Sequence, residues 1–548
     1  MACWLNLGQN LKVNAKKFPN NIALKDKDRA FTYPETNKRV NRLAHSLLSL
    51  GLEKGDKVAV LLENSIEIVE VYLATAKTGL VIVPINFRLL GSEVEGIVNN
   101  SDAKALIVHD EFTPTVDAIK PNLRNIAPSN YIVVRSSDGQ VVESNHSTIR
   151  PSDHPTSGYR EYEAFIRGSA ESEPEADVRP EDTWILIYTS GATGVPKGVV
   201  RSHESHIAFY LINAVDFGFN EHDVCLNIMP LCHINSTFFT FTFTYIGGSA
   251  YIHPARSFRA EEILEIIERE KITFISLIPT HYYLLLNASP PPAPPGRGGV
   301  RGAKKRDVSS IRKLLCSSAP VSKDTKKAIM EFFPGVELYE AYGSTEAGIV
   351  TVLKPEYQLA KLGSIGFESL GTDFVKLLDE EGNEVGVGEV GELYSRGPML
   401  FDGYYKLPEK TASSFRGEWF TAGDMARRDE DGFLEFVDRK DDMIITGGEH
   451  VYPSEVEKVI NAHPGVLEAG VVGLPDEKWG EVVTAFVIPK DPANPPTEED
   501  IIDFCRDKMA GYKRPKAVRF ISSGEMPRTG SGKIQRRQLR ERYTSKFD

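Results

Sequence analysis

Short apolar runs alternate with helical patterns along the first half of the chain, and this alternation constrains the fold more than any other feature. The runs at 57–63, 79–86 and 103–110 lack polar alternation, and a helical pattern at 65–79 lies between the first two. Apolar strands that are separated by helices are typical of a parallel sheet covered on both faces. The alternation continues to residue 279, with an amphipathic helix predicted over 258–271. We therefore predict an α/β architecture here.

After about Gly363 the alternation of apolar runs and helical patterns gives way to short apolar pieces separated by glycines. Residues 371–397 are apolar pieces punctuated by glycines, and the turn at 380–383 predicts a hairpin of antiparallel strands. From Asp441 onward the chain has helix and strand patterns of its own. The predicted fold class is therefore α/β, with large parallel α/β sheets, a β-rich subdomain and a small α+β domain at the C-terminus. Two polar or Pro/Gly-rich segments, 144–180 and 288–306, are predicted to be loops.

Charge and cysteine usage limit the partners and the compartment. The 548 residues include 64 Lys and Arg against 76 Asp and Glu, a net charge of −12. Because nucleic-acid-binding domains normally present a basic face, we expect no nucleic-acid partner. The five scattered cysteines indicate a reducing compartment and no metal cage. We see neither a signal peptide nor an apolar stretch long enough to span a membrane, so a cytoplasmic location is expected.

The strongest local signal is the segment 183–200, TWILIYTSGATGVPKGVV. An apolar strand is predicted to enter a turn whose glycines let successive backbone N–H groups point one way, while hydroxyls and a lysine add donors and charge. Such a nest suits the phosphates of a nucleoside triphosphate, although an ordinary Gly-rich turn remains the alternative for this segment alone. The pattern does not match a Walker loop. The residues concerned are Thr189, Ser190, Gly191, Ala192, Thr193, Gly194 and Lys197.

Further segments follow in a fixed order: MPLCHINST at 229–237, LLCSSAP at 314–320, YEAYGSTEAG at 339–348, the long stretch 420–457, and PRTGSGKIQRR at 527–537. With these motifs, nearly the whole chain resembles the acyl-adenylate-forming superfamily of acyl-CoA synthetases, peptide-synthetase adenylation domains and luciferases. The resemblance implies that a carboxylate attacks the α-phosphorus of ATP to give acyl-AMP and pyrophosphate, after which a thiol takes the acyl group. Ala192 departs from the family, which usually has Ser or Thr there.

The resemblance also implies roles for individual residues. Lys533 would act at the carboxylate and α-phosphate, Glu346 would bind Mg²⁺, and Thr345 would contact the α-phosphate region. Asp424 would bind the ribose hydroxyls with Arg439 as its partner. The walls around the adenine would be formed by Ser318, Ala319 and Pro320 on one side and by Glu340, Ala341, Tyr342, Gly343 and Ser344 on the other. ATP, Mg²⁺ and coenzyme A are the implied cofactor and co-substrates.

By the same resemblance the small C-terminal domain is mobile. The implied division is an adenylation domain at 1–438, a hinge at 439–441 with Asp441 as the hinge residue, and a mobile domain at 442–548. After adenylation, the face containing Gly447, Gly448 and Glu449 would receive the pantetheine arm of CoA. His233 would act as the gate between the pantetheine tunnel and the acyl pocket.

The acyl pocket is expected to be lined by neutral residues, namely Asn235, Ser236, Thr237, Phe238 and Ser317. Relatives that activate amino acids place an Asp on this helix, and those that use dicarboxylates need a cation; neither is present here. We therefore predict an AMP-forming acyl-CoA synthetase for a neutral-tailed monocarboxylic acid, fatty or aromatic. Two alternatives stay open: a stand-alone adenylating enzyme that loads a carrier protein, and a non-catalytic nucleotide-binding relative. A homodimer is kept as an option for the assembly.

Overall fold

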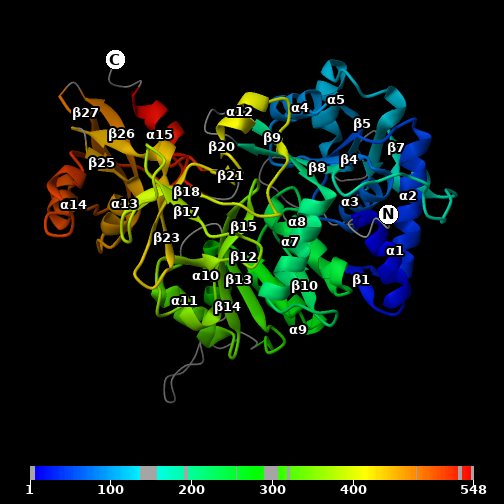
Figure 1. Ribbon diagram of the computed structural model, residues 1–548, viewed down its shortest axis with the longest axis horizontal. Coiled ribbons are helices and arrows are strands. Elements are labelled where there is room, and N and C mark those ends of the chain that lie inside the picture. Colours follow the sequence, from blue (N-terminus) through cyan, green and yellow to red (C-terminus); the bar gives the residue numbers. More distant parts are fainter. Residues whose placement is uncertain are drawn as a thin grey trace. The chain divides into compact units, whose positions relative to one another are not determined.

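The computed structural model describes residues 6–135, 157–190, 196–254, 256–288, 306–317, 321–447, 449–476, 478–528 and 533–544 (Figure 1). Their contacts divide the chain into two compact units. The first contains residues 1–374 and 395–420, and the second contains residues 375–394 and 421–548.

One sheet of the first unit has eight strands in the order β19-β9-β8-β4-β3-β5-β6-β7. Neighbours from β8 to β7 pair parallel, whereas β9 and β19 add antiparallel strands at one edge. The predicted parallel α/β pattern is confirmed in the core of this sheet. The strands are β3 (Lys57–Leu61), β4 (Val81–Pro84), β5 (Ala103–His109), β6 (Tyr131–Val134), β7 (Arg160–Glu161), β8 (Thr183–Ser190), β9 (Pro196–Ser202) and β19 (Gly403–Tyr404).

A second sheet supplies the first unit with strands in the order β16-β15-β14-β13-β12-β10-β11-β1-β2. The run from β14 to β1 is parallel, and β2, β15 and β16 are antiparallel additions. The bounds are β1 (Ile22–Lys25), β2 (Ala30–Thr32), β10 (Val224–Asn227), β11 (Ser249–Ile252), β12 (Phe274–Leu277), β13 (Lys313–Ser317), β14 (Glu337–Ser344), β15 (Gly348–Leu353) and β16 (Ser364–Glu368).

Helices of the first unit follow the predicted patterns. The amphipathic helix expected over 258–271 is α9 (Ala260–Glu270), which buries Ile263, Leu264, Ile266 and Ile267. The pattern at 65–79 becomes α3 (Ile66–Thr78), whose residues are all buried. Other helices that matter below are α2 (Tyr33–Ser49), α7 (His203–Asp216), α8 (Ile234–Ile246) and α11 (Lys323–Phe332).

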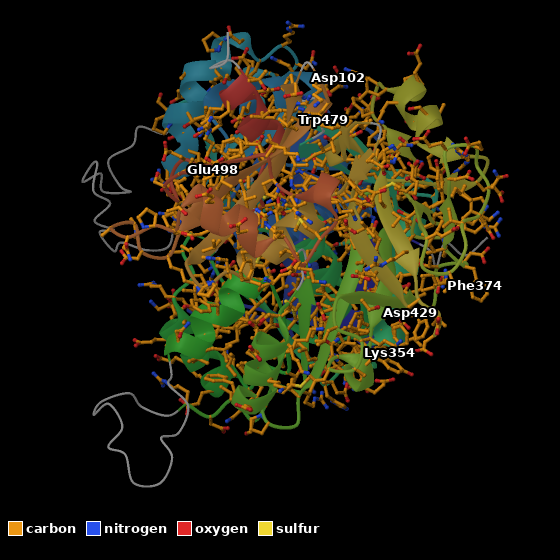
Figure 2. The ribbon with its side chains drawn as sticks, turned by 90° about the vertical axis from the view of Figure 1, so that its left-hand side faces the viewer. Asp102, Lys354, Phe374, Asp429, Trp479 and Glu498 are labelled. Carbon is orange, nitrogen blue, oxygen red and sulfur yellow. The ribbon has the colours of Figure 1, made fainter. Side chains whose placement is uncertain are left out.

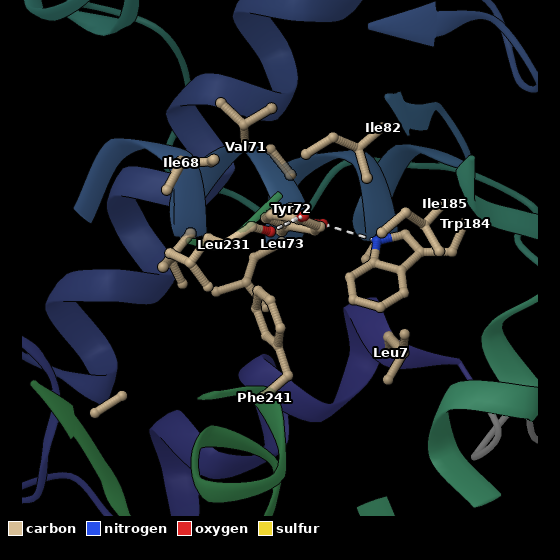
Figure 3. Packing of buried hydrophobic residues seen from close by; sticks show 14 of the residues in the cluster. Leu7, Ile68, Val71, Tyr72, Leu73, Ile82, Trp184, Ile185, Leu231 and Phe241 are labelled. Atoms are coloured by element: carbon tan, nitrogen blue, oxygen red, sulfur yellow. Dashed lines mark hydrogen bonds between the residues drawn. The ribbon is translucent and has the colours of Figure 1, made fainter. Parts of the chain in front are cut away.

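The core of this unit fixes the strand that leads to the predicted phosphate loop (Figure 3). Trp184 of β8 donates its indole N–H to the carbonyl of Tyr72 on α3, at 2.9 Å. The Tyr72 hydroxyl in turn donates to the carbonyl of Leu231, at 2.7 Å. Phe241 of α8 packs against both rings. Because each of these side chains is almost fully buried, β8 is held rigidly before the chain enters the loop.

The second unit begins with antiparallel strands. β17 (Lys376–Leu378) and β18 (Val390–Tyr394) pair with each other, as the turn at 380–383 predicted, and β22 (Asp424–Arg428) and β23 (Leu434–Arg439) extend the ladder. A five-stranded sheet of β24 (Ile444–Thr446), β25 (Glu449–Val451), β26 (Val466–Asp476), β27 (Gly480–Pro489) and β28 (Ala517–Phe520) follows. It carries the helices α13 (Pro453–Asn461), α14 (Glu498–Phe504) and α15 (Arg536–Thr544), which confirms the predicted α+β character.

The loop predicted at 144–180 is wrong in part. Residues 136–156 lie outside the described residues, but Arg160–Glu161 form β7 and Tyr162–Ile166 form the helix α6. The polar composition hid two apolar anchors, because Tyr162 and Ile166 are each 1 % exposed. In the second predicted loop, residues 289–305 lie outside the described part.

Two predictions about composition can be compared with the described residues. Cys225, Cys232, Cys316 and Cys505 are free and buried, as expected of small core residues. No helix in the described part of the chain is long and apolar enough to cross a membrane.

Candidate active site

The predicted phosphate-binding segment connects two antiparallel strands. β8 ends at Ser190 and β9 begins at Pro196, with Thr189 opposite Lys197 in the ladder. The Lys197 amino group lies 4.9 Å from the centroid of the Tyr404 ring on the neighbouring strand β19. The strand predicted before the loop is therefore confirmed. The loop residues Gly191, Ala192, Thr193 and Gly194 lie outside the described residues.

A buried arginine holds the backbone of the predicted metal-binding turn. Arg201 of β9 is 0 % exposed, and it donates to the carbonyls of Thr345, at 2.8 Å, and Met399, at 2.6 Å. A longer contact of 3.4 Å reaches the carbonyl of Glu346. Burial lowers the pKa of Arg201 to about 10, against the nearby negative charges of Asp402 and Glu346. The guanidinium therefore remains charged near neutral pH and fixes the turn between β14 and β15.

The side chain of Glu346 has its own hydrogen-bond donor. The Tyr404 hydroxyl donates to Glu346 Oε1, at 2.9 Å, and the Phe401 N–H donates to the Glu346 carbonyl, at 2.8 Å. The carboxylate is therefore oriented while the residue stays partly exposed. Together with Lys197, which lies over the Tyr404 ring, these contacts bring one carboxylate and one cation to the end of the phosphate-loop hairpin.

One predicted adenine wall, residues 340–344, forms the end of β14. Ser317 at the end of β13 is in register with Ala341 on β14. A Cβ on Gly343 would lie 2.0 Å from the Gly348 carbonyl oxygen, so only glycine allows β14 and β15 to approach this closely. Burial raises the pKa of Glu340, while the buried Lys326 of α11 pairs with this carboxylate and opposes the shift. Ser318, Ala319 and Pro320 lie outside the described residues.

Three predicted charged groups come together in the second unit. Asp424 and Arg439 face each other in the β22–β23 ladder, and Arg439 Nε lies 2.7 Å from Asp424 Oδ1. Lys533 is exposed as a residue, but the surroundings of its amino group desolvate that group and lower its pKa. Arg439 lowers this pKa further and Asp424 raises it, so the amino group lies within electrostatic reach of both. A carboxylate, a guanidinium and an ammonium group are thus gathered at one place.

The predicted CoA-facing segment turns against an aromatic ring. Gly447 has a φ of +60°, and a Cβ there would lie 2.8 Å from the ring of Trp479. Its N–H donates to the Trp479 carbonyl, at 2.8 Å. Trp479 itself is 43 % exposed (Figure 2). Glu449 and Asp441 are also exposed, and Gly448 lies outside the described residues.

The predicted acyl-pocket residues separate into two groups. Asn235 donates to Ser317 Oγ, at 2.8 Å, and accepts from Ser276 Oγ, at 2.9 Å, which makes an uncharged network between α8, β13 and β12. Phe238 instead packs on α7, with its ring centroid 3.4 Å from that of Phe209. Thr237 donates to the carbonyls of Leu231 and His233, and Ser236 is buried.

His233 stands at the N-cap of α8 without capping it. Burial lowers the pKa of this imidazole, and the charge of Arg88 lowers it further, so the ring is neutral near pH 7. Within the described part of the chain, its Nε2 atom has no hydrogen-bond partner. A neutral ring nitrogen is therefore available at this helix end.

Sequence reasoning missed several residues of this site. Arg201 gave one usable signal, because it directly follows two valines and its charge must be compensated if that strand is buried. Tyr404, Trp479 and Ser276 gave none, because each meets its partner only through the tertiary fold.

Known families and proteins resemble this chain over most of its length. Residues 11–405 match the family model for AMP-binding enzymes, and residues 455–533 match the model for the AMP-binding enzyme C-terminal domain. A feruloyl-CoA synthase from Amycolatopsis sp is 34% identical over 532 residues, covering 96% of this chain and 97% of that protein.

Two solved structures illustrate the likeness of fold. The anthranilate CoA ligase AuaEII in complex with anthranoyl-AMP superimposes with a TM-score of 0.84 at 29% identity, covering 100% of this chain and 99% of that one. The o-succinylbenzoate CoA synthetase MenE from Bacillus subtilis, in complex with ATP and magnesium ion, gives a TM-score of 0.79 at 28% identity, covering 97% and 98%.

The family models and the likeness of fold define an adenylate-forming enzyme. The chain belongs to the AMP-binding enzyme family. Within that family it is an AMP-forming acyl-CoA synthetase, an acid–thiol ligase that uses ATP and CoA.

Proposed function

We propose that the substrate is a monocarboxylic acid with a neutral tail, fatty or aromatic, which the enzyme converts to its CoA thioester. The observation that carries this proposal is the network of Asn235, Ser276 and Ser317, which is built from amide and hydroxyl groups alone. Ser317 is in register with Ala341 of the proposed adenine wall, which supports an acyl pocket beside the proposed nucleotide site. A charged tail would need an opposite charge when it is desolvated, and this network offers none.

The first half-reaction activates the acid. A carboxylate oxygen attacks the α-phosphorus of ATP, the bond from that phosphorus to the bridging oxygen breaks, and pyrophosphate leaves with the bond's electron pair. Such chemistry depends mainly on positioning and charge neutralisation. We assign Lys533 to the reacting carboxylate and α-phosphate, Thr345 to the same phosphate, and Asp424 with Arg439 to the ribose. Thr189, Ser190 and Lys197, with the loop that they flank, are assigned to the other phosphates.

Glu346 is the proposed Mg²⁺ ligand, and its surroundings fit that role. In the described part of the chain, no group of three or more His, Cys, Asp or Glu side chains could hold a metal. One partly exposed carboxylate suits Mg²⁺, which usually keeps waters and takes further oxygens from substrate phosphates. When bound, the ion would neutralise phosphate charge. The protein's part is the orientation of Glu346 by Tyr404 and Arg201.

The second half-reaction transfers the acyl group. The CoA thiol loses its proton, its sulfur attacks the acyl carbonyl carbon, and AMP leaves with the carbon–oxygen bond pair. We assign Gly447, Gly448 and Glu449 to the pantetheine side and His233 to the gate between that side and the acyl pocket. Asp441 is the proposed hinge between a domain at 1–438 and a mobile domain at 442–548. A cytoplasmic location and a homodimer stay predictions.

A panel of carboxylic acids tests the proposal. The purified enzyme is incubated with ATP, Mg²⁺, CoA and one acid at a time, and the CoA thioester is measured by mass spectrometry. Aliphatic and aromatic monocarboxylates should give thioester, whereas dicarboxylates and amino acids should give little. A second arm replaces CoA with a phosphopantetheinylated carrier protein. Preference for a dicarboxylate or an amino acid would refute the neutral-tail proposal, and preference for the carrier protein would refute CoA as the natural thiol.

A further inference from the structure

Arg536 joins three carboxylates at the start of α15. Its Nε and Nη2 atoms donate to both oxygens of Glu457, at 3.1 and 2.8 Å. Its Nη1 atom donates to Asp442 Oδ2, at 2.9 Å, and to Asp438 Oδ1, at 3.3 Å. Asp438 is 1 % exposed, and the guanidinium is mostly buried as well. This cluster is a built structural feature, because one buried cation serves three separate elements.

The three carboxylates differ in what they connect. Glu457 lies on α13 and also accepts from the Val471 N–H of β26, at 2.8 Å, so it ties Arg536 to the core of the C-terminal sheet. Asp438 lies on β23, directly before Arg439, and it accepts a second bond from the Ser454 N–H of α13, at 2.8 Å. Only the Asp438 contact therefore links Arg536 to the strand that carries the Arg439–Asp424 pair.

Arg536 is three residues after Lys533 in the sequence. Three residues span at most about 11 Å even when fully extended, so the position of Arg536 limits where the Lys533 backbone can lie. Gln535, between them, donates its N–H to the Pro527 carbonyl, at 2.8 Å, which limits the path further.

We propose that Asp438 and Arg536 are positioning residues for the adenylation step: their ion pair fixes the Lys533 segment to the strand that bears Arg439. This inference rests on the proposed role of Lys533 in adenylation. The proposed hinge at 439–441 leaves Asp438 on one side and Arg536, Ser454 and Glu457 on the other. The contacts of Asp438 with Arg536 and Ser454 are therefore among those that a movement about Asp441 must break, as is the bond from the Ser454 hydroxyl to the Val437 carbonyl, whereas the Arg536–Glu457 pair can persist.

Two isosteric variants separate this role from a merely structural one. Asp438→Asn and Glu457→Gln each remove one negative charge from the same cluster, and each leaves Arg536 with two carboxylates. They differ in the element from which the guanidinium is released. Asp438→Asn loosens Arg536 from β23, and the matched control Glu457→Gln loosens it from α13.

The two half-reactions are measured separately in each variant. The first is pyrophosphate release in a single turnover without CoA, with the panel acid of highest thioester yield. The second is CoA-dependent consumption of the synthetic acyl-AMP of that acid. A small misplacement of a group in the active site costs up to about a hundredfold in rate, so we expect Asp438→Asn to slow the first step about tenfold or more. The rate of the second step of Asp438→Asn should stay within about threefold of the wild-type rate. The rates of both steps of Glu457→Gln should stay within the same limit.

The controls distinguish failure of the inference from failure of the proposed function. Equal effects of the two variants on the first step, or an Asp438→Asn variant that slows both steps alike, would overturn the positioning role. A melting temperature lowered without any change in the ratio of the two rates would do the same. If the wild type releases no pyrophosphate with any acid, or if Lys533→Ala retains normal release, the proposed role of Lys533 is refuted. The positioning inference, which rests on that role, is then refuted as well.

Discussion

Replacing Tyr404 with phenylalanine removes one hydroxyl from the surroundings of Glu346 and keeps the ring. The hydroxyl donates to Glu346 Oε1, at 2.9 Å, and the ring packs against Phe401 and under Lys197. A hydrogen bond to a charged group contributes about 1.5–3 kcal/mol, which corresponds to about a 10- to 150-fold change in an equilibrium constant. Partners that orient a metal ligand typically matter by about 10- to 100-fold. We therefore expect Tyr404→Phe to weaken Mg²⁺ binding, so that the free Mg²⁺ concentration at half-maximal rate rises by about 10- to 100-fold.

The assay is the initial rate of pyrophosphate release at saturating MgATP and acid, with free Mg²⁺ varied. Tyr405→Phe is the matched control, because the next residue also donates its hydroxyl to a carboxylate, Asp102, at 2.8 Å. This control loses the same kind of bond away from Glu346 and should leave the Mg²⁺ dependence unchanged. An equal shift in both variants, or a normal Mg²⁺ dependence in Tyr404→Phe, would refute the assignment of Glu346 as the oriented metal ligand.

Three further predictions concern other parts of the site. Arg201→Met removes the guanidinium that donates to the Thr345 and Met399 carbonyls. The turn should be misplaced, so adenylation should slow about tenfold or more, with little change in the acid concentration at half-saturation. Steady-state kinetics over both substrates would contradict this prediction if only acid binding were lost. Desolvation of the Lys533 amino group lowers its pKa, so the rate of the first half-reaction should fall as pH rises through a value below that of an ordinary lysine. Lys533→Arg should remove that alkaline limb because arginine stays protonated, and an unchanged limb in the variant would assign it to another group. Asn235→Ala breaks both bonds of the uncharged network. It should alter the ranking of acids by kcat/KM, while the ATP concentration at half-saturation stays the same. A change in the ATP dependence alone would place the network outside the acyl pocket.

Features with a regular sequence period were predictable, and features made by distant contacts were not. The apolar runs located the parallel strands in the cores of both large sheets, and α9 appeared where its pattern predicted it. The antiparallel strands β2, β9 and β19 at the sheet edges carry no such period. Tyr162 and Ile166 were missed because two apolar anchors inside a polar, acidic segment are too few to form a pattern.

The same distinction holds for the site. The motif residues Asp424, Arg439 and Lys533 were assigned from resemblance, and they gather in the second unit. The hydrogen bonds that orient site residues cannot be predicted from the sequence, because they join distant positions. Arg201, for example, donates to the carbonyl of Thr345, which lies 144 positions further along the chain. A sequence pattern can thus name candidate groups for the chemistry, whereas their orientation depends on buried carbonyls and hydroxyls supplied by the tertiary fold.

The position of β19 at the edge of the eight-stranded sheet has a consequence for synthesis of the protein. β9, with its buried valines, is complete at Ser202, but its outer neighbour begins only at Gly403. A ribosome that adds about 5–20 residues per second needs roughly 10–40 s to make the intervening chain. During that time β9 presents unpaired backbone groups along an apolar edge, which favours aggregation. Nascent chains of this length therefore expose the outer edge of the β8–β9 hairpin until β19 has been synthesised.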